Sequence, residues 1–232
     1  MKITSNQLKG FVLILLSIFL ISGRKGTQMG NVQGPEKASS YTAKDFSRLL
    51  GMEGFSDTLL KNHFKLYEGY VSNTNAVREK LGGITLEAKP SIDYSEIKRR
   101  FGFEFSGMRL HEYYFGNLIK GGKALGKNSA LAEKINAVYG SFDAWKKDFI
   151  GTGSMRGVGW AILYYDPQNH QLFNVWIDQH QVNNLPGCKP ILVMDVWEHA
   201  FMIDYQLDRA KYIEAFMKNV DWQEAANRLG VE

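Results

Sequence analysis

The stretch Asp195-Val196-Trp197-Glu198-His199 decides how the chain is interpreted, because it places a carboxylate and an imidazole four residues apart. It ends an apolar, β-type run at 190–195 and leads into helical spacing at 197–205. A carboxylate oxygen and an imidazole nitrogen at this spacing can reach one point, and further imidazoles would complete a site for a first-row transition metal. On spacing alone, an Asp–His hydrogen bond at the start of a helix explains the motif equally well.

Two more of the five histidines lie on predicted helices, among aromatic neighbours. Apolar residues recur at helical spacing over 57–80, which predicts a helix with His63 on its apolar side. A second helix is predicted over 104–120 and carries His111. A single histidine on an apolar face is more often a core residue, but two on adjacent helices shift the balance toward ligation. Three imidazoles and one carboxylate suit iron or manganese, whereas copper electron-transfer sites require a thiolate.

The remaining pattern predicts an all-helical first half and a mixed second half. The two long helices form a hairpin, joined by a loop that contains Pro90. After them we expect helices at 129–140 and 141–152, strands at 160–165, 172–177 and 190–195, and helices at 197–205 and 211–228. The fold class is therefore α+β. A helical hairpin domain at 41–125 precedes an α+β metal-binding domain at 126–232 with a three-stranded antiparallel sheet.

Composition excludes several classes of protein. Of the 232 residues, 44% are hydrophobic and 22% are charged, which is ordinary for a chain that buries a core and unlike a disordered or coiled-coil protein. The net charge is only +4 and no long basic run is present, so we expect no nucleic-acid partner. Cys188 is the only cysteine, which excludes an internal disulfide and a zinc site built from several cysteines.

The first 23 residues have the pattern of a secretory signal. Lys2 and Lys9 precede an apolar block at 11–21, and small residues follow it. The block is shorter than the roughly 20 residues that span a bilayer. We therefore expect export to the periplasm or the outside, with no stable membrane insertion unless this segment stays uncleaved as an anchor. Residues 24–40 are polar and Gly-rich and are interpreted as a linker.

These motifs together resemble the iron/manganese superoxide dismutases. The string at 195–201, followed by Asp204-Tyr205, is similar to that family's signature. His63 with Tyr70-Val71 resembles its first-helix motif, and the residues at 111–115 resemble its second. Agreement extends over nearly all of 41–232, and the predicted architecture is that family's fold.

The resemblance implies one iron or manganese ion per chain, held by His63, His111, Asp195 and His199. It implies superoxide as the substrate, disproportionated to oxygen and hydrogen peroxide. A metal-binding relative without turnover is the alternative, and a helical domain with core histidines and no metal is a third hypothesis.

The resemblance also implies roles for the residues around the metal. Tyr70 would stand at the substrate gate, and His180 would take the place of the family's glutamine beside the metal-bound solvent. Glu198 would bridge to the ligand histidine of a partner subunit, which implies a homodimer. The others are the pocket walls Trp160 and Trp197 and the funnel residue Arg209.

Four features depart from the family pattern. His63 and Tyr70 are seven residues apart, where most members have eight. Leu66 and Tyr67 stand where the family has a gate histidine, and Phe201 replaces the tyrosine that usually pairs with it. Gly107 occupies the place where iron enzymes have a glutamine. The sequence therefore leaves the choice between iron and manganese open.

Overall fold

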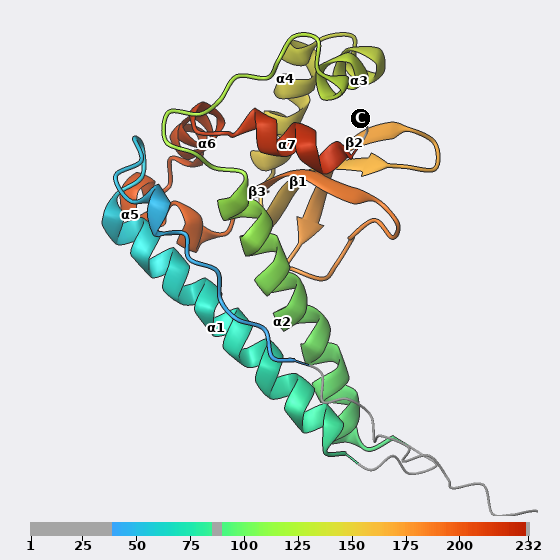
Figure 1. Ribbon diagram of the computed structural model, residues 1–232. Helices are drawn as coiled ribbons and strands as arrows, with labels where there is room; N and C mark the ends of the chain where they lie inside the picture. The colour runs from blue at the N-terminus through green and yellow to red at the C-terminus, as the bar shows by residue number, and fades with distance from the viewer. Residues whose placement is uncertain (1–38, 85–89, 231–232) are drawn as a thin grey trace, which may run out of the picture. The chain divides into compact units, whose positions relative to one another are not determined.

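The computed structural model describes residues 39–84 and 90–230, which belong to one compact unit, Ser39–Glu232 (Figure 1). The expected signal segment at 1–23, and all of the linker at 24–40 except its last two residues, lie outside the described residues. Across 39–84 and 90–230, no helix is both long enough and apolar enough to cross a bilayer. The expected α+β class is confirmed, while the boundary at residue 125 stays a prediction.

The two long helices, α1 (Asp57–Gly82) and α2 (Ile92–Gly116), lie side by side as an antiparallel hairpin (Figure 1). The hydroxyl of Ser56 accepts a hydrogen bond from the backbone of Leu59 and so begins α1 as expected. The prediction for α2 was wrong at both ends. Ser91 caps the helix well before residue 104, ahead of a polar and exposed first half that carries little apolar periodicity. The helix ends at Gly116 because Asn117 turns its side-chain amide back to the carbonyl of Tyr114.

The sheet has the order β2-β1-β3, and both pairings are antiparallel, as predicted. Strand β1 (Gly159–Asp166) is central and almost wholly buried, which explains its uninterrupted apolar run. Strand β2 (Gln171–Asp178) forms one edge, and β3 (Lys189–Asp195) forms the other. Helices α2 and α7 (Trp222–Leu229) both pack against β3. The hairpin and the sheet therefore meet at the strand that ends in Asp195.

The predicted short helices are confirmed as α3 (Ala130–Tyr139) and α4 (Phe142–Gly153). The prediction of one helix over 197–205 was wrong, since a single 3-10 turn (Glu198–Ala200) precedes the four-residue α5 (Met202–Tyr205). The prediction of one helix over 211–228 was also wrong. It consists of α6 (Arg209–Lys218) and α7, because Val220 bridges to Leu118 and Asp221 caps α7 with its carboxylate. These are contacts between distant segments, which periodicity cannot reveal.

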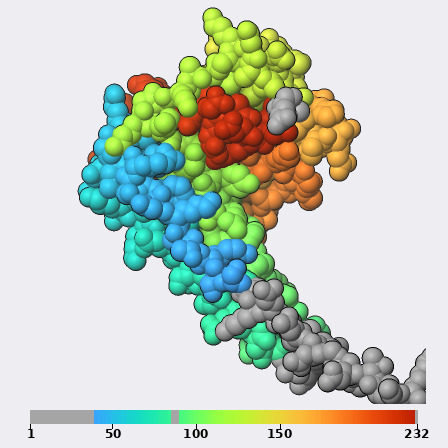
Figure 2. All heavy atoms as spheres, in the orientation of Figure 1, coloured from blue at the N-terminus to red at the C-terminus, as the bar shows by residue number. Residues whose placement is uncertain are grey.

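Residues 39–46 form a strap that lies along the hairpin before the 3-10 turn Ser47–Leu49 (Figure 2). Tyr41 and Asn75 exchange two hydrogen bonds of 2.9 Å, between the backbone of the strap and the side-chain amide on α1. The backbone N–H of Lys44 donates to the Tyr67 hydroxyl at 2.9 Å. The strap also contacts α2, where the Arg109 guanidinium lies 5.1 Å from the Tyr41 ring and Lys44 pairs with Glu112, so it is fixed across both helices of the hairpin.

Candidate metal centre

The structure brings all four predicted ligands to one point between the hairpin and the sheet. His63 comes from α1, His111 from α2, Asp195 from the end of β3 and His199 from the 3-10 turn that follows. One nitrogen or oxygen from each lies within 4.8 Å of the others. The nearest contacts are those of Asp195 Oδ2, which is 3.3 Å from His63 Nε2 and 3.2 Å from His199 Nε2. Asp195 is fully buried, whereas the His199 side chain is 27% exposed.

The second-helix histidine is held in one tautomer by its own helix. Nδ1 of His111 lies 2.6 Å from the carbonyl oxygen of Gly107, which can only accept a hydrogen bond, so Nδ1 carries the proton. Burial lowers the pKa of His111 well below its usual value, with a smaller contribution from His63. The ring is therefore neutral, and Nε2 presents a lone pair to the cluster, 3.7 Å from Asp195 Oδ2.

The carboxylate at the centre stays ionised despite its burial. Desolvation alone would raise the pKa of Asp195, but the charge and hydrogen bond of His199 and the contact with His63 outweigh it. They hold the pKa of Asp195 well below its ordinary range. Burial also lowers the pKa of His63, so its imidazole is neutral as well. The cluster thus offers one anionic oxygen from Asp195 and the neutral imidazoles of His63 and His111, the protonation states that metal ligation requires.

A metal ion fits this cluster by two structural criteria. Both ring nitrogens of His63, and Nε2 of His111, are buried without a hydrogen-bond partner in the described part of the protein. Orphaned polar atoms of this kind are rare in native proteins, and a bound ion is one of their few explanations. The dimensions are close to those of a ligand set, because two atoms 4.8 Å apart are each 2.4 Å from the point midway between them, only slightly more than a metal–nitrogen bond of about 2.0–2.2 Å. Three nitrogens and one carboxylate oxygen suit iron or manganese.

Tyr70, the predicted gate residue, and His180, the predicted substitute for the family's glutamine, are hydrogen-bonded to each other. The Tyr70 hydroxyl lies 2.7 Å from His180 Nε2, and Trp160 Nε1 donates to His180 Nδ1 at 3.0 Å. Because Nδ1 accepts from Trp160 and burial lowers the pKa of His180 to about 4, the neutral ring carries its proton on Nε2. His180 therefore donates to Tyr70, whose own hydroxyl proton remains available for a third partner.

The two tryptophans predicted as pocket walls both contact histidines of the cluster, and their role stays a prediction. Trp160 is fully buried, with its ring 5.0 Å from that of His111 in an edge-to-face arrangement. Trp197 stacks on His180 and His199 at centroid distances of 4.8 and 5.8 Å. Two aromatic rings thus lie against the histidines of the cluster.

Among the described residues, Glu198 and Arg209 form no hydrogen bond or ion pair with the four predicted ligands. Glu198 is exposed. The Arg209 guanidinium donates to the backbone carbonyls of Met155 and Gly157 at 2.7 and 2.8 Å. The roles expected for Glu198 and Arg209 stay predictions.

The short spacing from His63 to Tyr70 is accommodated without a break in α1, which runs as a regular α-helix from Asp57 to Gly82. Residues seven apart share one face of such a helix, so Tyr70 lies two turns beyond His63. Its ring stacks on His111 at 5.1 Å and occupies the space in front of Gly107. A Cβ atom at residue 107 would lie only 2.6 Å from the Tyr70 ring. The place of the missing glutamine is therefore filled by the gate tyrosine.

Tyr67, which replaces the gate histidine, is turned away from the metal cluster toward the strap. Its hydroxyl donates to Glu112 Oε1 at 3.1 Å. The other oxygen of Glu112 binds Arg109 at 2.6 Å and Lys44 at 3.2 Å. Burial raises the pKa of Tyr67 to about 12, so the phenol stays protonated. This side of the site is closed by a charged network.

The sequence did not predict the residues that support Asp195 through hydrogen bonds to the backbone of β3. The hydroxyl of Tyr212, on α6, donates to the backbone carbonyl of Asp195 at 2.5 Å and also reaches the Tyr114 hydroxyl at 3.2 Å. The Asn117 side chain accepts a hydrogen bond from Val193 and so ties α2 to β3. No local pattern marks these residues, because their partners are far away in the chain.

The buried His180 makes the metal-free protein sensitive to acid. Its pKa of about 4 in the folded protein lies below the ordinary value of 6.5, so the unfolded chain binds the proton more tightly. The stabilising contribution is complete above pH 6.5 and is lost as the pH falls toward 4, by roughly 3 kcal/mol. In urea unfolding of the metal-free protein, the free energy of unfolding of His180→Gln should change less with pH in this window than that of the wild type. Parallel curves would contradict this assignment.

Comparison with known proteins identifies what the chain is similar to. Residues 127–228 match the family model of the C-terminal domain of iron/manganese superoxide dismutases. An iron superoxide dismutase of Aquifex pyrophilus is 36% identical over 192 residues, which cover 80% of this chain and 89% of the relative. That of Pyrobaculum aerophilum is 34% identical over 170 residues, covering 72% and 80%. A manganese/iron superoxide dismutase of Aeropyrum pernix is 33% identical over 170 residues, covering 72% and 79%.

Proposed function

The chain belongs to the iron/manganese superoxide dismutases, and from that premise we propose that it disproportionates superoxide to oxygen and hydrogen peroxide. One iron or manganese ion per chain, held by His63, His111, Asp195 and His199, would supply the one-electron chemistry. The observation that carries the proposal is the convergence of these four side chains, with buried imidazole nitrogens that have no hydrogen-bond partner within 39–84 and 90–230.

The chain's own residues handle the protons that peroxide formation consumes. Two superoxide ions and two protons give one oxygen and one hydrogen peroxide, so a donor must stand beside the substrate. Trp160 fixes the tautomer of His180, and His180 donates to the Tyr70 hydroxyl. Burial raises the pKa of Tyr70 above its usual value, so the phenol is protonated at neutral pH. Tyr70 is thus the group placed to donate a proton toward the substrate.

The test is elemental analysis together with an assay of superoxide disproportionation, on protein expressed in iron-rich and in manganese-rich medium. About one ion per chain with activity is the expected result, and comparison of the two samples identifies the working metal. A fully loaded but inactive protein would favour the metal-binding relative without turnover. The rebuilt Tyr67–Glu112 network is the observation that makes this second candidate worth testing.

Assembly into a homodimer is part of the proposal. Glu198 is exposed beside the partly exposed ligand His199, and it is the residue that the family resemblance places against the partner subunit. Three apolar side chains that follow His199 in the chain are also exposed: Met202, Ile203 and Leu207. An acidic group and apolar surface around an incompletely covered ligand favour a subunit interface at this face.

Glu198→Ala should weaken the dimer by at least about tenfold in dissociation constant, because it leaves the partner's donor unpaired in a buried interface. Sedimentation equilibrium measures the change. Glu214→Ala, which removes an exposed carboxylate from α6, is the matched control and should leave the association unchanged. Equal dissociation constants for the two variants would argue against this interface.

Export remains a proposal that rests on the pattern of residues 1–23 alone. Superoxide is an anion and crosses membranes poorly, so an exported enzyme would act on superoxide formed outside the cytoplasm. Fractionation with N-terminal sequencing tests this. A mature protein beginning near residue 24 outside the cytoplasm is expected, and an intact N-terminus confined to the cytosol would contradict it.

A further inference from the structure

His199 is the predicted ligand with the least support from its own secondary structure. It lies in the three-residue 3-10 turn Glu198–Ala200, which no side chain caps in the part of the chain that the structure describes. Its side chain is 27% exposed, whereas those of His63, His111 and Asp195 are fully buried. A 3-10 turn of this length is not stable by itself, so contacts with distant segments must hold it in place.

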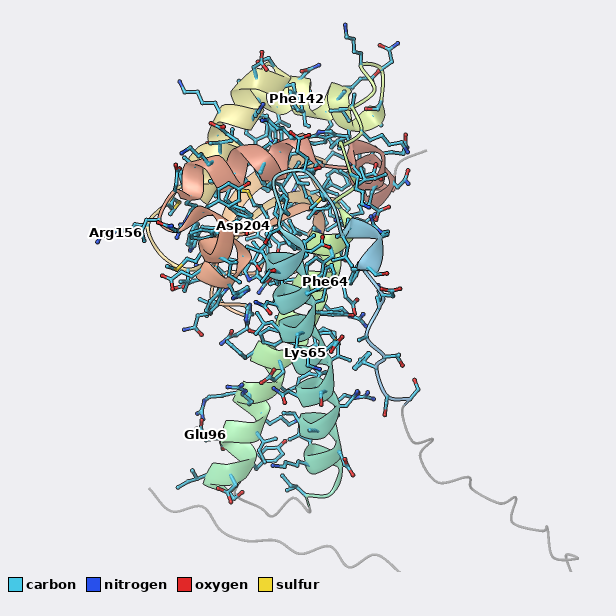
Figure 3. The ribbon with its side chains drawn as sticks, turned by 90° about the vertical axis from the view of Figure 1, so that its left-hand side faces the viewer. Phe64, Lys65, Glu96, Phe142, Arg156 and Asp204 are labelled. Atoms are coloured by element: carbon cyan, nitrogen blue, oxygen red, sulfur yellow. The ribbon has the colours of Figure 1, made fainter. Side chains whose placement is uncertain are left out.

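Asp204, which lies in α5 five residues after His199, ties this turn to the first long helix. Its Oδ2 accepts a hydrogen bond of 2.7 Å from the backbone N–H of Ser56 (Figure 3). Ser56 is the N-cap of α1, seven residues before His63. The two partners are 148 positions apart in the chain. The contact therefore joins the segment that carries His199 to the helix that carries His63.

Tyr205 makes a second contact with the same stretch of chain. Its hydroxyl donates to the backbone carbonyl of Gly54, two residues before Ser56. Burial chiefly raises the pKa of Tyr205, and the neighbouring charge of Asp204 adds to the rise, so the phenol keeps the proton that it donates. Two adjacent side chains of α5 thus bind the backbone just ahead of α1.

The electrostatics favour the contact of Asp204 with the start of α1. The N-terminal end of a helix carries a partial positive charge, which stabilises a carboxylate beside it. A hydrogen bond from a backbone N–H to a carboxylate is also stronger than one to a neutral acceptor. Asp57, the other carboxylate at this end of α1, binds the backbone of Gly51 and lies 3.9 Å from Lys61 instead.

The backbone directly after these two residues is strained. Gln206 has φ 51° and ψ −119°, in the region of positive φ that favours glycine. Strained backbone persists only where surrounding contacts over-determine it, and it is concentrated at functional sites. The contacts of Asp204 and Tyr205 meet this requirement, because they fix the chain immediately before Gln206 to another segment.

We propose that Asp204 is a positioning residue for the metal site, which holds the His199 turn against the start of α1 and so fixes His199 relative to His63. The inference rests on the proposed ligand set and adds to it a residue that acts through the backbone. Asp208, the next acidic residue along the chain, does not serve this purpose, because its carboxylate binds the backbone and the side chain of Lys211 in its own helix.

The first test uses the full-length iron-loaded protein. The electron paramagnetic resonance spectrum of high-spin ferric iron reports the geometry of its ligands, and competition with EDTA gives the dissociation constant of the metal. Asp204→Ala should change the rhombicity of the spectrum and raise the dissociation constant at least about tenfold, as the loss of outer-shell partners does. Asp204→Asn keeps an oxygen acceptor for the Ser56 N–H and should restore the wild-type spectrum and most of the affinity.

Asp208→Ala is the matched control. Asp208 is also an acid that accepts a backbone N–H, but it caps α6 and makes this contact within its own helix. Its loss should lower the free energy of unfolding, as the loss of a cap does, and leave the ferric spectrum and the dissociation constant unchanged. The pair of variants therefore separates positioning of the ligand from a general loss of stability.

The second test needs no metal. The backbone N–H groups of Ala200, Phe201, Asp204 and Tyr205 are hydrogen-bonded within the segment. In the metal-free protein, their hydrogen–deuterium exchange should be about fivefold faster in Asp204→Ala than in the wild type, because the loss of one hydrogen bond favours local opening. Exchange in Asp208→Ala should match the wild type over these residues.

Three results would overturn the inference: a wild-type spectrum or wild-type exchange in Asp204→Ala, an equal effect in Asp208→Ala, or no rescue by Asp204→Asn. None of these measurements requires turnover, so they are separate from the test of the proposed function. A protein that shows the expected dependence on Asp204 but does not consume superoxide would overturn only the proposed activity.

Discussion

His199→Ala should remove the metal and the activity together while leaving the fold intact. The expected metal content falls from about one ion per chain to a small fraction, and the rate of superoxide disproportionation falls by more than about 100-fold, since losing even an outer-shell partner costs 10–100-fold. His199 is the ligand best suited to this test. It lies in a short 3-10 turn and is partly exposed, so its loss costs less packing than that of His63 or His111.

The control for this variant is His170→Ala. His170 is the exposed histidine of the turn between β1 and β2, and its ring bonds to Tyr165 rather than to the metal cluster. Elemental analysis and circular dichroism of both variants separate the hypotheses. If His199→Ala retained a full metal load, the ligand assignment would be wrong. If the wild type and both variants were folded and metal-free, the histidines would be core residues.

Local patterns could single out the four residues as candidates, since His63 and His111 lie on predicted helices among aromatic neighbours and Asp195 and His199 are four residues apart at the end of a buried strand. Spacing alone left an Asp–His hydrogen bond and core histidines open, and the ligand set followed only from the resemblance to the iron/manganese superoxide dismutases. Local patterns of this kind fix which side of an element faces the core. The convergence of the four in space then follows from packing α1 against α2 and α2 against β3.

The features of the fold and the site that the sequence did not predict depend on contacts between distant segments. The first half of α2 is stabilised by the Ser91 cap and by pairs such as Arg100–Glu104, not by an apolar stripe, so periodicity missed it. The break between α6 and α7 is set by the bridge from Val220 to Leu118. Tyr212 supports Asp195 from α6, and no sequence motif predicts this contact.

The change at Gly107 was visible in the sequence, but its meaning was not. The missing glutamine was interpreted as a role taken over by His180. The structure places the Tyr70 ring in front of Gly107, whose carbonyl holds the His111 tautomer. Residue 107 on α2 is a glycine because the seven-residue spacing of His63 and Tyr70 on α1 places the Tyr70 ring where a side chain would lie. This link is visible only once the two helices are packed together.

Gly107→Ala should therefore destabilise the protein, although alanine is the better helix former. Helix propensity alone would favour the variant by up to about 1 kcal/mol. The new Cβ would lie 2.6 and 2.8 Å from two carbons of the Tyr70 ring, and that ring is already packed against His111 and His180. Overpacking of this kind costs about 1–3 kcal/mol. We expect a net loss in the free energy of unfolding, measured in urea, and at least about a tenfold loss of activity as Tyr70 leaves His180.

Gly69→Ala is the matched control, since Gly69 is also helical and directly precedes Tyr70, but has no atom within 4 Å of an added Cβ. It should stabilise the protein by about 0.5–1 kcal/mol and leave activity unchanged. Opposite signs for the two substitutions would show that the penalty at residue 107 arises from the Tyr70 ring and not from the loss of a flexible residue.

The same geometry argues against converting the site by Gly107→Gln. A glutamine cannot occupy this position until Tyr70 moves, so the variant should lose the Tyr70–His180 hydrogen bond before gaining any contact with metal-bound solvent. Combining it with His180→Ala removes one neighbour of the ring but not the contact with residue 107, and should not restore activity. An active double variant that prefers iron would contradict this expectation. It would mean that the Tyr70 ring can move to another place beside the metal site, and that the spacing of His63 and Tyr70 does not fix the position of the ring.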